Sequence, residues 1–139
     1  MSDPGAARVE AGHRRLRVSM AAGSFYDLVF AVINLAAPGL GSWFLEIPLP
    51  DDELYLRVTG VFLLALALFY MLPVVYPGRY LGNVLVAIAA RLGGAVFFIA
   101  AALAFGRPPA FLFLGLIDLL FAVMHVVFLR QAGWPPPDR

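Results

Sequence analysis

Two stretches of the chain place an acidic residue and a second polar residue at the same spacing within otherwise apolar sequence. Asp27 is followed seven residues later by Asn34, and Asp118 is followed seven residues later by His125. Residues at this spacing share one face of an α-helix, so each stretch predicts an apolar helix with a polar stripe. An ionisable group in such a segment costs several kcal/mol unless it is paired or functional. These four residues are therefore the first candidates for a functional site.

The composition of the chain is typical of a membrane protein. Of its 139 residues, 62% are hydrophobic and 14% are charged, and the mean hydropathy is +0.86. Four apolar segments each approach the ~20 residues that a membrane-spanning helix needs. These segments cover about residues 21–38, 54–76, 82–105 and 110–130. Because short turns follow the second and third segments, we expect an all-α integral membrane protein in which residues 21–130 form one antiparallel four-helix bundle.

The positions of the arginines predict the orientation of the bundle. All ten basic residues are arginine; apart from Arg91 inside the third segment, seven would lie on the side of the two termini, against two on the other side. The positive-inside rule then places both termini in the cytoplasm. Residues 1–20 are expected to form a solvated, arginine-rich tail, with a helix lying on anionic lipid as the alternative. Residues 131–139 are expected to form a proline-rich tail, and residues 39–53 an irregular outer loop that caps the bundle.

The first apolar segment has a second interpretation. Arginines precede it and Ala36-Ala37 resembles a cleavage site, as in a secretory signal peptide. Asp27 and Asn34 favour a retained span, because polar residues are unfavourable in the apolar region of a signal peptide.

A rise of 1.5 Å per residue estimates how far each polar side chain lies from the cytoplasmic end of its helix. Asp27 and His125 fall at roughly 10 and 8 Å, and Asn34 and Asp118 at roughly 20 and 18 Å. Arg91 falls between the two levels, at roughly 14 Å. Its planar guanidinium is always charged and can bind two carboxylates, so we predict ion pairs of Arg91 with Asp27 and Asp118.

Two tyrosines complete the predicted network. Tyr26 is adjacent to Asp27, and Tyr70 reaches a similar depth from the second segment. We expect a tyrosine hydroxyl, Asn34 and His125 to take the remaining hydrogen bonds. The network has two interpretations: polar contacts that only hold helices together, or a functional site.

Small residues flank the polar positions, where they either let backbones approach closely or leave a cavity. They are Ser24, Ala31, Ala87, Gly94, Gly115 and Ala122. On the third segment, Ala89 with Gly93 and Ala90 with Gly94 favour close packing within the bundle or against another protomer.

Missing residue types exclude several kinds of chemistry. The chain has no cysteine, which excludes disulfides, thiolate metal sites and iron–sulfur clusters. A b-type haem needs two facing histidines, whereas only His125 lies in an apolar segment. We therefore expect no metal and no other cofactor. The net charge of +1, without a basic run that contains aromatic residues, predicts no nucleic-acid binding.

The polar residues of three predicted helices together resemble the DoxX-like group of small bacterial four-helix membrane proteins. The residues that carry the resemblance are Tyr26-Asp27, Arg91-x-x-Gly94, and Asp118 with His125. The resemblance covers about residues 20–130 and implies the four-helix fold and a bacterial inner membrane. Some members of the group are linked to quinone-coupled or thiol redox systems and carry cysteines. This chain has none, so no thiol activity is carried over.

Three functions are compatible with these residues. The first is a non-enzymatic membrane protein whose polar interior binds a small lipophilic ligand or supports a membrane complex, such as a redox-linked one. The second is a membrane enzyme that acts on a lipophilic substrate, with Asp27, Asp118 and His125 as acid and base groups. The third is a small proton-coupled transporter. The expected partners are the lipid bilayer, a lipophilic small molecule, and a second copy of the chain or a partner membrane protein.

Overall fold

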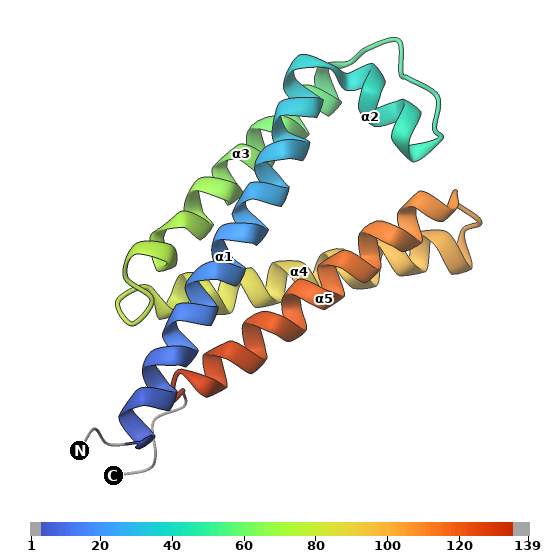
Figure 1. The fold of residues 1–139 in the computed structure, drawn as a ribbon. Coiled ribbons are helices and arrows are strands. Elements are labelled where there is room, and N and C mark those ends of the chain that lie inside the picture. The colour runs from blue at the N-terminus through green and yellow to red at the C-terminus, as the bar shows by residue number, and fades with distance from the viewer. Residues whose placement is uncertain (1–3, 135–139) are drawn as a thin grey trace.

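The computed structural model describes residues 4–134. Within this range the chain forms five helices and no strand (Figure 1). The helices are α1 (Pro4–Ala36), α2 (Pro38–Leu45), α3 (Leu54–Val75), α4 (Leu81–Ala104) and α5 (Pro109–Gln131). All except α2 are long and apolar enough to cross a membrane. The fold is therefore the all-α membrane helical bundle that the composition predicts.

The four long helices form two antiparallel hairpins. α1 packs along α3, and α4 packs along α5 (Figure 1). The hairpins meet where a short turn joins α3 to α4 and where α1 packs against α5. From this closed end the two hairpins diverge toward the end that carries α2, which we call the open end (Figure 1). The bundle is thus a wedge, and its two hairpins frame the space between them.

α1 begins far before Ala21, so the predicted arginine-rich tail is wrong for the described part of residues 1–20. Gly12, Leu16 and Met20 recur every fourth residue and form one face of the helix. Leu16 and Met20 are buried in the core, and Gly12 lies directly against the backbone of Gln131 at the end of α5. The arginines occupy the other faces. The segment is therefore helical because this small and apolar face packs against the bundle, although the segment is rich in arginine.

The remaining boundaries agree closely with the predicted segments, because α3, α4 and α5 each begin and end within one residue of them. The loop predicted to be irregular instead begins with the short helix α2. Pro38 occupies the start of this helix, where its missing N–H costs nothing, and α2 ends at Glu46 in the left-handed conformation. Most of the predicted proline-rich tail, and the segment 1–3, lie outside the described residues.

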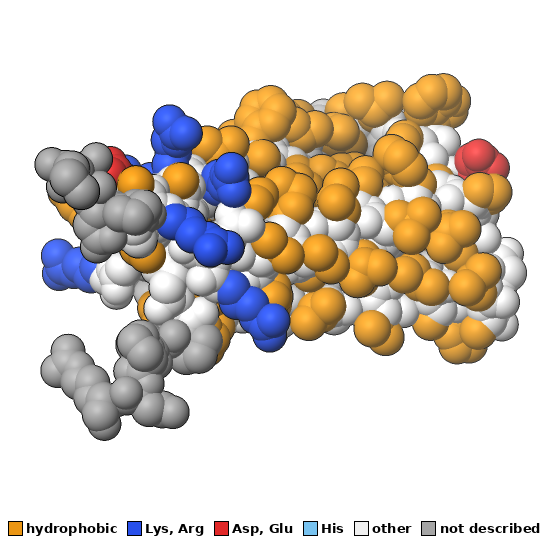
Figure 2. All heavy atoms as spheres, turned by 60° about the horizontal axis from the view of Figure 1, so that its bottom comes forward, with side chains coloured by type: hydrophobic (Ala, Val, Ile, Leu, Met, Phe, Trp, Pro, Cys, Tyr) orange, Lys and Arg blue, Asp and Glu red, His pale blue; other side chains and the backbone are white. Residues whose placement is uncertain are grey.

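The packed core lies at the closed end of the wedge. Its fully buried members come from all four long helices: Leu16, Met20, Tyr70, Val84, Ala87 and Leu129. The outside of the bundle is apolar, with arginines gathered at one end (Figure 2). Phe62, Leu68 and Val96 are examples of large side chains that point outward with 63–70% of their surface exposed. A continuous apolar exterior of this kind matches lipid rather than water.

Candidate functional site

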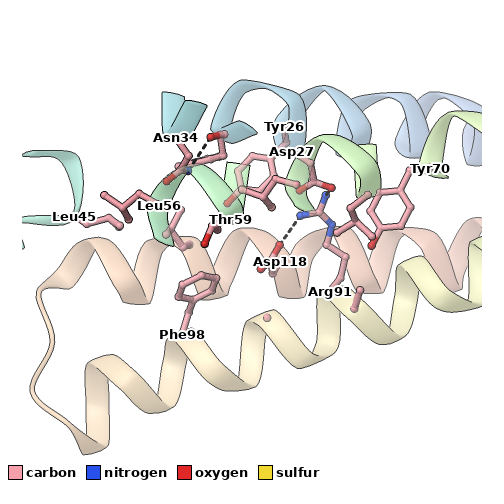
Figure 3. A pocket seen from close by; sticks show the side chains of 16 residues that line it. Tyr26, Asp27, Asn34, Leu45, Leu56, Thr59, Tyr70, Arg91, Phe98 and Asp118 are labelled. Carbon is pink, nitrogen blue, oxygen red and sulfur yellow. Dashed lines mark hydrogen bonds and ion pairs between the residues drawn. The ribbon is translucent and has the colours of Figure 1, made fainter. Parts of the chain in front are cut away.

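Arg91 is the centre of a buried group of ion pairs, which we call the Arg91 cluster: Arg91, Asp27 and Asp118. Arg91 Nη1 lies 2.7 Å from Asp118 Oδ1 on α5, and Arg91 Nη2 lies 2.7 Å from Asp27 Oδ2 on α1 (Figure 3). The three residues are between 2% and 6% exposed. The structure therefore contains both of the ion pairs that helix depth predicts for Arg91.

Two glycines let the cluster form. Arg91 Nη2 also donates a hydrogen bond of 2.8 Å to the carbonyl of Gly23, one helical turn before Asp27. Gly94, one turn after Arg91, lies so close to the Asp118 carboxylate that a Cβ there would overlap it. The cluster thus connects α1 of one hairpin with α4 and α5 of the other. Because little water reaches the buried charges, their mutual attraction is screened less than it would be at a surface.

Aromatic rings surround the guanidinium of Arg91. Its Cζ lies 5.1 Å from the ring centroids of Tyr26 and Phe121, and 5.7 Å from that of Tyr70. The faces of aromatic rings attract cations, so these contacts stabilise the buried charge. The sequence predicted a hydroxyl contact instead. The buried Tyr70 hydroxyl makes no hydrogen bond with the described residues.

Asn34 and His125 do not join the ion pairs, so the hydrogen bonds predicted for them are wrong. Asn34 Nδ2 donates a hydrogen bond of 2.8 Å to the carbonyl of Phe30 in its own helix, a common alternative for short polar side chains. His125 is fully buried, and its ring stacks on Phe121. Neither nitrogen of its ring has a hydrogen-bond partner within the described structure.

A cavity of about 370 Å³ lies between the two hairpins and ends at the Arg91 cluster. Its volume falls in the range of small-molecule sites. Leu56, Thr59 and Phe98 line it toward the open end, whereas Asp27 and Asp118 lie farther inside (Figure 3). The site residues predicted from sequence that line the cavity are Tyr26, Asp27, Asn34, Tyr70, Arg91 and Asp118. His125 does not line the cavity.

Sequence reasoning missed the apolar half of the site and two contacts of the cluster. Leu56 and Phe98 have the same character as lipid-facing residues, so nothing in the sequence marks them as cavity residues. Phe121 is likewise one of many aromatic residues in the spans. Gly23 had a detectable signal, because it lies four residues before Asp27 and so shares its helix face.

The small-residue pairs of α4 face in different directions. Gly94, of the pair Ala90 and Gly94, packs on Asp118, and both residues line the cavity. Ala89 and Gly93 are exposed, and a Cβ on Gly93 would contact nothing within 4 Å. Of the two pairs, only Ala90 with Gly94 therefore contributes to packing within the described bundle.

Comparison with known proteins does not assign the chain to a family. No protein-family model matches it, and comparisons with curated proteins and with solved structures give no significant match. The resemblance to the DoxX-like group stays a prediction. In the described part of the chain, no group of three or more His, Asp or Glu residues is placed to hold a metal ion.

Proposed function

We propose that this protein binds a small lipophilic molecule in the cavity between its two hairpins. The observation that carries the proposal is a cavity of about 370 Å³ with largely apolar walls that ends at the Arg91 cluster. Apolar cavities with a few convergent polar groups are the usual form of a small-molecule site. Because the exterior of the bundle is apolar and suited to lipid, we expect the ligand to reach the cavity from the membrane.

A purely structural role accounts less well for the polar residues. Polar contacts between membrane helices contribute about 1–2 kcal/mol at most, and desolvating ions offsets much of that gain. Asp27 joins α1 to Arg91 and Asp118 joins α5 to it, but two carboxylates against one guanidinium leave an excess negative charge that the joining of helices does not require. Glycines already allow close packing, as Gly60 does against α1 and Gly115 does against α4. The excess negative charge beside a cavity therefore supports a binding role.

The cavity proposal is tested by replacing Thr59 with tryptophan. Thr59 points into the cavity (Figure 3), and within the described structure its hydroxyl donates a hydrogen bond only to the Tyr55 carbonyl of its own helix. We expect the indole to fill the cavity and to lower the amount of lipophilic molecule that co-purifies with the protein at least about tenfold, without a loss of folding stability. Native mass spectrometry of the protein purified from membranes measures this occupancy.

Val61→Trp is the matched control, because Val61 is 56% exposed on the same helix and does not line the cavity. This control is expected to retain the bound molecule. Equal occupancy in wild type and in Thr59→Trp would show that the molecule binds elsewhere, and wild-type protein without any bound molecule would also count against the proposal.

We also propose that the protein is a multi-pass protein of a bacterial inner membrane with both termini in the cytoplasm. Near the two described ends, Val9 lies beside Gly133, and Trp134 packs against the core at the closed end. The excess of arginine on this side supports a cytoplasmic location. The bilayer is then the immediate partner, and the outward Ala89 and Gly93 leave a face for a second copy or a partner membrane protein.

Reporter fusions test this orientation. A reporter after Leu45 is expected to lie on the side opposite to a reporter at the C-terminus, and the C-terminal reporter is expected to be cytoplasmic. The two positions are separated by α3, α4 and α5, which cross the membrane an odd number of times. The same sidedness for both reporters would contradict the topology.

A further inference from the structure

The cavity also indicates which class of molecule it accepts. We infer that its ligand is a lipophilic alcohol, whose apolar body occupies the cavity and whose hydroxyl binds at the carboxylates of the Arg91 cluster. This inference rests on the proposed binding function and adds the chemistry of the head group. Three observations each exclude one other kind of head group.

The charge of the cluster excludes an anionic head. Asp27 and Asp118 both pair with Arg91, so the ionised cluster carries one negative charge in excess. Among the described residues, no other charged side chain lines the cavity. A lipophilic acid would bring a second uncompensated negative charge into a site of low dielectric constant, where like charges repel strongly.

The free oxygens of the cluster favour a head group that donates a hydrogen bond. Arg91 donates hydrogen bonds to Oδ2 of Asp27 and to Oδ1 of Asp118, and its Nη2 also donates to the carbonyl of Gly23. The second oxygen of each carboxylate accepts no hydrogen bond from the described residues. An ionised carboxylate has about four acceptor positions, so each retains unused capacity. An ether or a ketone cannot use that capacity.

Two buried donors favour a head group that also accepts. The Tyr70 hydroxyl and Arg91 Nε are buried in the described structure without a hydrogen-bond partner. Both residues line the cavity, and a buried donor without a partner costs about 1–3 kcal/mol. A protonated amine would compensate the excess negative charge and donate to the carboxylates, but it has no acceptor to offer, so both buried donors would stay without a partner. A hydroxyl both donates and accepts, so it meets all three conditions.

Four probes with the same twelve-carbon chain test the inference: dodecanol, dodecyl methyl ether, dodecanoate and dodecylamine. Wild-type protein in phosphatidylcholine nanodiscs is exposed to each probe at equal membrane concentration, and native mass spectrometry measures the amount bound. We expect dodecanol to bind at least about tenfold more tightly than each of the others. Thr59→Trp is expected to abolish the binding of dodecanol.

Asp118→Asn provides an internal check, because it leaves Asp27 and Arg91 as a neutral pair. We expect the preference for dodecanol over dodecanoate to shrink at least about threefold in this variant. If all four probes bind equally and Thr59→Trp blocks them, the cavity site stands and the alcohol inference is overturned. If another probe matches dodecanol, the inference is overturned as well. If Thr59→Trp blocks none of them, the proposed binding function itself fails.

Discussion

Replacing Arg91 with methionine is expected to lower the free energy of unfolding by about 3–5 kcal/mol. The substitution removes the only ion-pair partner that Asp27 and Asp118 have within residues 4–134, and both carboxylates remain buried. An ion without a partner in a low-dielectric interior is strongly unfavourable. Equilibrium unfolding in mixed detergent micelles, followed by circular dichroism, measures the change.

Arg107→Met is the control for this variant. Arg107 is exposed in the loop between α4 and α5 and forms no ion pair in the described structure. Its replacement is expected to change stability by less than about 0.5 kcal/mol. Wild-type stability of the Arg91 variant would mean that the ion pairs do not hold the two hairpins together.

Removing the whole cluster is expected to reverse the loss. In the triple variant Arg91→Met, Asp27→Leu and Asp118→Leu, none of the three ions of the cluster remains. Leucine branches at the same carbon as aspartate, so it fits a similar shape. Replacing a buried group of ions by apolar side chains is often neutral or stabilising by about 1–4 kcal/mol, so we expect at least wild-type stability in the same unfolding measurement.

The partial variant Arg91→Met with Asp118→Leu shows whether both aspartates matter. Because Asp27 also pairs with Arg91, this double variant leaves one buried carboxylate without a partner. Its stability is expected to lie between those of the single and triple variants. A triple variant no more stable than Arg91→Met alone would show that the energetics of the cluster are not those of buried ions.

Helix periodicity and depth were sufficient to predict the ion pairs. The rise per residue placed Arg91 between Asp27 and Asp118, and a guanidinium has the geometry to bind both. Long apolar runs likewise predicted α3, α4 and α5 to within one residue at each boundary. These features depend on spacing along single helices, which a sequence records directly.

Features that depend on tertiary packing could not be predicted in the same way. The Asn34 side chain could donate a hydrogen bond either to the cluster or to the carbonyl of Phe30. It donates to the carbonyl, which lies one turn earlier in the same helix. The cavity exists because the two hairpins diverge, and no residue spacing encodes the angle between them. The start of α1, in contrast, could have been predicted from sequence, because Gly12, Leu16 and Met20 recur at helical spacing. The arginines between them make the segment polar on average, and this favoured the prediction of a solvated tail.

We propose that the cluster and the cavity form a ligand site and do more than hold helices together. The most direct measurement is the amount of lipophilic molecule that co-purifies with the triple variant, determined by native mass spectrometry beside the wild type. We expect a folded protein whose occupancy is at least about tenfold lower, because the polar end of the site is gone. A folded triple variant that retains wild-type occupancy would contradict the claim.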